Sequence, residues 1–358
     1  PAYFANRCLH FNDFLSAANE ELSALLYRRQ LQSRLRDNRA AVCRQYAELA
    51  GVLGEAAAEL SAELVPDPVR EKRLRQHLTA QGIECRLAAY YDQAGHLRIE
   101  LEGAGLAPLR KPEAVDRLSK LMNFPLRPLD ETRRDQLVLV QSEPLMAVAG
   151  AAAQKKDGQA VSGDTGAWFK HDDGSLYVLL CDGMGSGAPA QRESTLAVRL
   201  LEQFLRAGVR PENALRTLNS ALALRNDEAA GGFTTIDLLR VDLFTGEAWV
   251  YKYGAAPTYL RRGTSVSRVT GAALPAGLTD GERTTPDVTR LQLEAGDTVV
   301  LVSDGVADGR EDQWLRDALA AFDGESPKDL ARELVAAGTD EAGPRDDRTA
   351  LVVRLSAR

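Results

Sequence analysis

The chain has little of the chemistry that zinc and redox sites require. Its four cysteines and four histidines are scattered over 358 residues, and no CxxC pair occurs. This spacing argues against a zinc site and is typical of a protein kept in a reducing compartment. If a metal is bound, its ligands are therefore expected to be oxygen atoms.

Long apolar runs and an excess of positive charge are also missing from the sequence. No stretch approaches the ~18 to 20 apolar residues that cross a membrane, and the first residues lack the basic and apolar parts of a signal peptide. The formal net charge of -7 argues against nucleic acid as the main partner. The printed residues are accordingly expected to be cytoplasmic.

The first of three predicted regions, residues 1–65, is a helical segment. Its apolar residues from Leu31 to Leu60 largely follow alternating steps of three and four, which is typical of a coiled-coil seam. Packing of this helix on the chain's own domains is an equal alternative, because Gly51 and Gly54 weaken an isolated helix. The prolines in "VPDPV" (65–69) end the segment.

The second region, residues 66–143, is predicted to be a small α+β module. Its pattern indicates a helix over 68–82, a hairpin that turns at Ala94 and Gly95, a helix over 111–124 and a strand over 135–142. Acidic residues occur singly here and form no catalytic cluster. A regulatory or interaction module is the plainest interpretation.

The third region, residues 144–358, contains many short apolar strands and two amphipathic helices at about 190–224. The strands form long hairpins and do not alternate with helices. This order predicts two packed sheets with helices outside them.

Acidic residues recur at the ends of strands in this third region. "LYVLLCDG" and "TVVLVSDG" are apolar strands that end in Asp182-Gly183 and Asp304-Gly305. Asp346 and Asp347 precede another strand, and Asp164 lies in "VSGDTG". Carboxylates without nearby histidine or thiol are the ligands that Mg²⁺ and Mn²⁺ prefer, and their mutual repulsion would be costly without a cation.

Several stretches in this region resemble a known family: "VSGDTG", "CDGMGSGAPAQRES", "LNSALALRND", "FTTIDLLRVDLFTGEAWVYKYGAAPTYLRRG", "LPAGL", "GDTVVLVSDGVADG" and "RDDRTALVV". In this order they are similar to the phosphatase domain of the stage II sporulation protein E family, which belongs to the PP2C class of metal-dependent serine/threonine phosphatases. The resemblance implies an α+β fold, in which a PP2C-type αββα sandwich follows a long helix and a small α+β regulatory domain. It also implies a multi-pass membrane region before the printed residues.

The same resemblance implies a site for two divalent cations, Mn²⁺ or Mg²⁺. Asp182 would bridge the two ions, and the Gly183 carbonyl would complete one of them. Asp304 and Asp346 would bind the other ion, and Asp164 would hold its metal through water. Asp182 and Asp304 are the expected catalytic residues, and the glycines of "GMGSG" would let the backbone approach the ions.

Two positions depart from the wider class. Where eukaryotic members of the class carry a phosphate-gripping arginine shortly before the first acidic motif, this chain has Gln159, and Lys155 and Lys156 are the other candidates. Asp347 is the second departure: it adjoins Asp346, and the start of a strand can aim only one of the two directly at a metal.

The resemblance implies a protein phosphatase that acts on the phosphoserine of an anti-sigma-factor antagonist of the STAS type and thereby activates a sporulation sigma factor. The resemblance is also consistent with a cell-division protein as a second partner. The seam within 13–64 predicts a homodimer, in which the module at 66–143 would act on the helices at about 190–224 and so on the metal site. The alternatives are a stress-response phosphatase of the same class with another substrate, and a pseudophosphatase that only binds partners.

Overall fold

A computed structural model describes residues 64–92, 94–129, 133–226, 232–278, 285–307, 312–337 and 345–358, besides the single residues 25, 51 and 54. The chain divides into two units, Pro1–Glu55 and Ala56–Arg358. The long helix predicted within residues 1–65 lies almost wholly outside the described residues, so its seam stays a prediction. No helix in the described ranges is long and apolar enough to cross a membrane.

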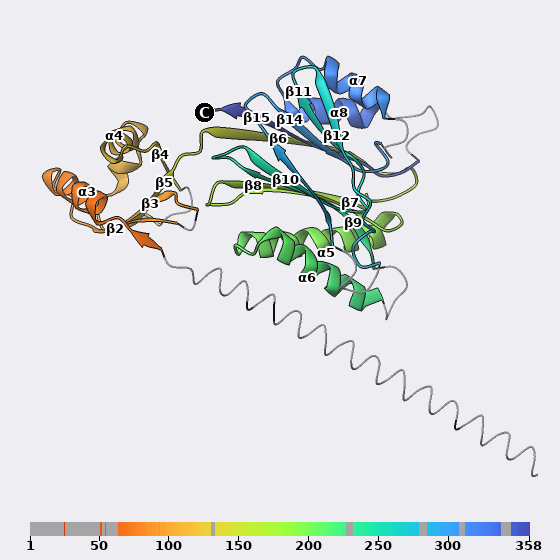
Figure 1. Cartoon of the computed structure of the whole chain (residues 1–358), viewed down its shortest axis with the longest axis horizontal. Coiled ribbons are helices and arrows are strands. Elements are labelled where there is room, and N and C mark those ends of the chain that lie inside the picture. The colour runs from red at the N-terminus through yellow and green to blue at the C-terminus, as the bar shows by residue number, and fades with distance from the viewer. Residues whose placement is uncertain are drawn as a thin grey trace, which may run out of the picture. The chain divides into compact units, whose positions relative to one another are not determined.

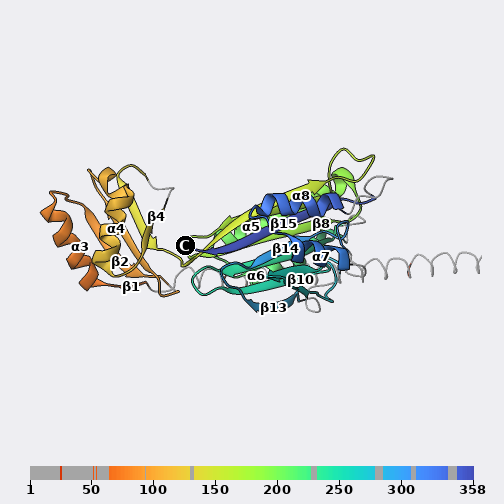
Figure 2. The same ribbon diagram turned by 90° about the horizontal axis from the view of Figure 1, so that it is seen from above.

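A five-stranded antiparallel sheet with two α-helices is built from residues 65–141, in the strand order β1-β2-β3-β5-β4. Its helices α3 and α4 pack on this sheet through Leu74, Leu78 and Leu118 (Figure 2). The elements are β1 (Val65–Pro66), α3 (Pro68–Ala80), β2 (Arg86–Tyr91), β3 (Leu97–Glu102), the short 3-10 helix η1 (Ala107–Arg110), α4 (Pro112–Met122), β4 (Leu126–Pro128) and β5 (Gln136–Gln141).

The two predicted helices, the hairpin and the last strand of this module are confirmed. Helix α3 begins where expected because Pro68 occupies its first turn and the Asp67 side chain accepts a hydrogen bond from the backbone of Arg70, at 3.0 Å. The prediction missed β1, η1 and β4, which are only two to four residues long.

Two further antiparallel sheets pack face to face, as the resemblance implied (Figure 1). The first has the order β13-β10-β9-β8-β7 and the second the order β12-β11-β14-β15-β6. Their strands are β6 (Leu145–Gln154), β7 (Asp164–Lys170), β8 (Ser175–Gly183), β9 (Thr234–Asp242), β10 (Glu247–Tyr253), β11 (Thr258–Arg262), β12 (Ser265–Val269), β13 (Asp287–Gln292), β14 (Thr298–Val302) and β15 (Arg348–Ala357).

Helices cover the outer faces of this sandwich. Helices α5 (Gly187–Arg206) and α6 (Pro211–Asn226) pack on the first sheet, and α7 (Gln313–Ala321) and α8 (Pro327–Ala337) on the second (Figure 1). The core between the sheets includes Val178 and Leu180 of β8 and Leu301 of β14. The sequence analysis predicted α5 and α6 but not α7 and α8.

A buried carboxylate lies in the connection between β5 and β6. Glu143 is completely buried and forms ion pairs with Arg127 at 2.7 Å, Lys170 at 2.8 Å and Arg358 at 3.7 Å. Burial alone would raise the pKa of Glu143, but the hydrogen bonds from Arg127 and Lys170 lower it to about 2.

Candidate metal centre

Two of the predicted acidic residues face each other across neighbouring strands. Asp182, near the end of β8, is the register partner of Asp164 at the start of β7. Directly opposite residues in an antiparallel pair project from the same face of the sheet. Leu180, two residues before Asp182, belongs to the core between the sheets. Both carboxylates therefore face the second sheet, at the edge of that core.

The remaining predicted ligands come from the second sheet. Asp304 follows β14, and Asp346 precedes β15, the neighbour of β14. Both carboxylates lie close enough to Asp182 to raise its pKa by charge repulsion. The structure thus brings Asp164, Asp182, Asp304 and Asp346 together, although up to 182 positions separate them along the chain, from 164 to 346.

Burial and neighbouring carboxylates perturb the pKa values of Asp182 and Asp164. Burial, followed by the charges of Asp164 and Asp304, raises the pKa of Asp182 to about 9. Burial likewise raises the pKa of Asp164 to about 6. Ser303 and Thr349 approach Asp164 and oppose that rise, but neither reaches hydrogen-bonding geometry, and both buried oxygens of Asp164 lack a hydrogen-bond partner. Such oxygens fit a divalent cation or its water ligands.

The described carboxylates do not by themselves form a complete coordination shell. Within the described ranges, no three Asp, Glu, His or Cys side chains surround one point closely enough to hold an ion by themselves. Mg²⁺ commonly keeps several waters and takes only one or two carboxylates directly. The donor set of carboxylate and backbone oxygens therefore fits hydrated divalent ions and does not fit zinc.

Asp346 and Asp347 have different environments. Asp347 is buried, and its two oxygens accept hydrogen bonds from the backbone of Lys156, at 2.8 Å, and of Gly163, at 2.7 Å. It ties the segment before Asp164 to the start of β15. Asp346 is half-buried, and its Oδ1 accepts a hydrogen bond from the backbone of Asp347, at 2.9 Å. Asp346 is therefore the freer of the two carboxylates.

The glycines after Asp182 and Asp304 allow other backbone to approach. A Cβ on Gly183 would lie 2.0 Å from the carbonyl oxygen of Ala190 in α5, and one on Gly305 would lie 2.1 Å from the carbonyl oxygen of Asp347. Any side chain would therefore push α5 or the start of β15 away. The glycine of each Asp-Gly pair therefore lets α5 or the start of β15 pack closely against the end of a strand.

The three candidates for gripping phosphate differ in their contacts. Gln159 is half-buried, and its Oε1 lies 2.3 Å from where a Cβ on Gly187 would be, beside the first turn of α5. Lys155 is exposed and donates to the carbonyl of Ala160 at 3.3 Å. Lys156 is half-buried, and its backbone donates to Asp347.

The sequence analysis missed three polar residues next to the cluster. Asp237, Lys252 and Thr258 are each 1% exposed. Asp237 lines a small pocket of about 20 Å³ together with Asp182, Thr235, Ser303 and Asp304. The available signal was one acidic residue in "TIDLLRV" and one lysine in "AWVYKYG", two strands in which most residues are apolar.

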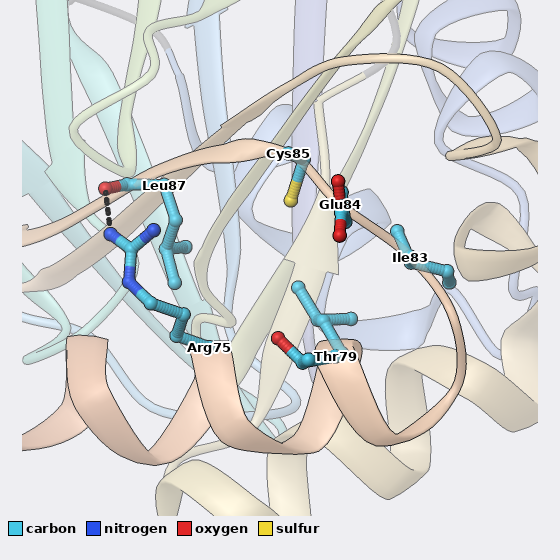
Figure 3. Close-up of a pocket in the computed structure, with 7 residues that line it drawn as sticks. Arg75, Thr79, Ile83, Glu84, Cys85 and Leu87 are labelled. Atoms are coloured by element: carbon cyan, nitrogen blue, oxygen red, sulfur yellow. Dashed lines mark hydrogen bonds between the residues drawn. The ribbon is translucent and has the colours of Figure 1, made fainter.

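A separate pocket of about 230 Å³ lies between α3 and the start of β2 (Figure 3). Arg75, Thr79, Glu84 and Cys85 line it with apolar neighbours, and Arg75 reaches the carbonyl of Leu87 at 3.5 Å. Burial raises the pKa of the Cys85 thiol. One carboxylate and one unreactive thiol do not form a catalytic group.

Comparison with known proteins gives matches along most of the chain. The stage II sporulation protein E (SpoIIE) family model matches residues 172–356. Stage II sporulation protein E of Bacillus subtilis (strain 168) is 26% identical over 342 residues, which cover 91% of this chain and 41% of that protein. The protein of the same name from Priestia megaterium is 25% identical over 367 residues, 97% of this chain and 62% of that protein. The chain thus spans less than two thirds of either relative.

A solved structure has the same fold. It contains the PP2C phosphatase domain and a fragment of the regulatory domain of SpoIIE from Bacillus subtilis. It superposes with a TM-score of 0.68 at 24% identity and covers 91% of this chain and 98% of that one. The sandwich of β6 to β15 is therefore a PP2C-type fold.

Proposed function

Because the chain belongs to the stage II sporulation protein E family, we propose that it is a metal-dependent protein serine phosphatase of the PP2C type. The observation that carries the proposal is the register pair of Asp164 and Asp182, with Asp304 and Asp346 close enough to act on Asp182 by charge. Four carboxylates gathered at one edge of the core, which raise the pKa of Asp182 by burial and charge, are typical of a functional site and less so of a module that only binds partners.

The proposed ligands are Asp164, Asp182, the Gly183 carbonyl, Asp304 and Asp346, with Mn²⁺ or Mg²⁺ as the ions. Divalent ions held there would polarise the phosphoryl group and lower the pKa of a water molecule. Asp182 and Asp304, from different sheets, would hold the ions between them. Asp347 would act indirectly, because its hydrogen bonds fix the loop that carries Gly163 and Asp164.

Gln159 is the proposed contact to phosphate among the three candidates. Its side chain lies against Gly187, which has a φ of +71° at the first residue of α5. A side-chain amide there could donate to an anion at this helix N-terminus. Lys155 points its amine to Ala160 and is the weaker candidate.

The proposed substrate is a phosphoserine protein, an anti-sigma-factor antagonist of the STAS type, whose dephosphorylation activates a sporulation sigma factor. Exposed apolar side chains beside the cluster support a protein substrate. Met184, 53% exposed, directly follows Gly183. Leu274 and Leu278, 47% and 44% exposed, flank Ala276, which pairs with Thr234 next to Asp182. Such a surface can contact a folded partner but adds little for a short phosphopeptide.

Further proposals follow from the apolar seam of the helical segment and from the family. They are a homodimer formed through residues 13–64, a membrane region before the printed residues, and a cell-division protein as a second partner. Movement of α5 would be the means by which residues 66–143 act on the site, because Gly183 contacts Ala190 of that helix directly.

The test of the proposed function is phosphate release from the phosphoserine form of such an antagonist, with Mn²⁺, with Mg²⁺ and with excess chelator. Asp182→Ala and Asp304→Ala are expected to lower turnover by several orders of magnitude while the fold is retained, because these residues mainly hold cations. Full activity in chelator, or in either folded variant, would refute the proposal. Phosphate release by residues 144–358 alone should also be compared with that by the whole chain, because a difference would indicate regulation by the preceding residues.

A further inference from the structure

Asp237 and Lys252 form a buried ion pair that the proposed ligand set does not include. Lys252 Nζ lies 2.7 Å from Asp237 Oδ2, and both side chains are 1% exposed. The two residues are register partners on β9 and β10. Removing two charges from water has a cost that only complete hydrogen bonding offsets.

Only one of the two carboxylate oxygens of Asp237 has hydrogen-bond donors. Asp237 Oδ2 accepts from Lys252 and also from Thr258 Oγ1, at 2.5 Å, while Lys252 donates a second hydrogen bond to the carbonyl of Ala256, at 2.5 Å. Asp237 Oδ1 is equally buried and has no donor among the described residues. A pair with a purely structural role would be expected to satisfy both oxygens.

The unpartnered oxygen belongs to a residue that lines the pocket of the acidic cluster. Asp237 is the register partner of Leu180, two residues before Asp182 on the same face of β8. The shared pocket of about 20 Å³ is large enough for one water molecule. Asp182, Thr235, Ser303 and Asp304 also line it and supply the further polar partners that such a water needs.

We propose that Asp237 is a positioning residue for the metal centre, which holds an ordered water against the cluster through Oδ1. Lys252 and Thr258 fix the carboxylate by its other oxygen and offset its charge. The water's remaining hydrogen bonds orient Asp182 and Asp304 for their ions. This inference rests on the proposed phosphatase function, and Asp237 itself is not placed among the ligands.

The test separates positioning from support of the fold. The double variant Asp237→Leu/Lys252→Met removes the ion pair together and fills its volume, an exchange that is often neutral or stabilising in protein cores. Asp237→Asn keeps the shape of the side chain and serves as the second variant. Asp297→Asn is the matched control, because Asp297 is a buried carboxylate paired with Arg262 at 2.6 Å and lies just before β14, whereas Asp304 follows that strand.

Mn²⁺ binding is measured by calorimetry and by the electron paramagnetic resonance signal of free Mn²⁺, beside turnover of a small phosphate ester. Both Asp237 variants are expected to fold, to raise the Kd for Mn²⁺ about tenfold or more and to lower kcat, as substitutions outside the direct ligands commonly do. The control should keep the Kd of the unchanged protein.

Folded Asp237 variants with unchanged Kd and kcat would overturn the inference, and so would an equal loss in the control. If the double variant does not fold, Asp237→Asn decides by the same two measurements. A failure of the unchanged protein to bind Mn²⁺ or to release phosphate would overturn the proposed function as well. Failure of the proposed function can be distinguished from failure of the inference, because it is seen in the unchanged protein before any substitution is made.

Discussion

Replacing Asp182 by asparagine is expected to stabilise the metal-free protein and to abolish its stabilisation by Mn²⁺. Asparagine has nearly the same shape as aspartate but carries no charge. It would therefore remove the free-energy cost of holding this carboxyl protonated in the folded protein, without opening a cavity. The structure gives the size of this effect through the pKa of Asp182.

Burial and the charges of Asp164, Asp304 and Asp346 raise that pKa from 3.8 to about 9. A carboxyl group with a raised pKa binds its proton more tightly in the folded protein, so the free energy of unfolding falls as the pH rises from 3.8 towards 9. At about 1.4 kcal/mol per pH unit, the roughly three units up to pH 7 cost about 4 kcal/mol. If Asp182→Asn recovers half or more of this free energy, its Tm should lie on the order of 5–10 °C above that of the unchanged protein.

Thermal and urea unfolding should be followed at pH 7 in chelator and again in millimolar Mn²⁺. In chelator, Asp182→Asn should unfold at a higher temperature than the unchanged protein. In Mn²⁺ this difference in unfolding temperature should narrow or reverse, because Mn²⁺ that binds only the folded state stabilises the unchanged protein. Asp297→Asn is the control and should destabilise in both conditions, because it breaks a pair with Arg262. A metal-free Asp182→Asn protein that is less stable than the unchanged one would refute the reasoning.

Three other predictions concern other parts of the chain. Glu143→Gln should lower the free energy of unfolding at pH 7 by about 3 kcal/mol, because the pKa of Glu143 is lowered from 4.5 to about 2. The unchanged protein should lose this stability as the pH falls from 4.5 towards 2, and urea unfolding as a function of pH measures it. Met184→Asp should lower kcat/KM for the intact phosphoprotein while turnover of a small phosphate ester is kept; equal losses on both substrates would contradict a docking role. Leu49→Arg combined with Leu53→Arg should lower the mass in solution if residues 13–64 dimerise, and a folded variant with unchanged mass and rate would leave the segment as a structural brace.

The strand-end aspartates could be predicted because their signal is local. An apolar run that ends in Asp-Gly places a carboxylate at the edge of the core whatever the rest of the chain does, and Asp182 and Asp304 share this arrangement. The environment of Asp347 could not be predicted, because its donors are the backbone groups of Lys156 and Gly163, about 190 residues away along the chain. Asp237 and Lys252 were missed because a buried pair across a hairpin resembles two isolated charges in the sequence.

The fold was predicted where amphipathic periodicity was strong. Helix α5, of 20 residues, has a clear apolar face and was expected. Helix α7, of 9 residues, is too short for periodicity to stand out, and α8 was missed although α4, also of 11 residues, was predicted. Strand β6 was missed because "LMAVAGAAAQ" is rich in alanine, which has a low preference for strands. It is held by pairing with β15 along ten residues and by α8, whose start leaves no room for a Cβ at Gly150.

The position of β15 has a consequence for how the protein is made. It lies inside its sheet, between β14 and β6, so the strand that begins at Leu145 has no partner until residues 348–357 have been translated. Asp346 emerges from the ribosome with the same segment. Nascent chains should therefore expose the edge of β6 while residues 155–347 are made, and the free edge of β14 only after residue 302, which makes them candidates for chaperone binding. Because the closing strand and the last of the four clustered carboxylates arrive together, a prematurely terminated chain would lack both the finished sandwich and the complete acidic cluster. The proposed phosphate release could therefore begin only once the domain is whole.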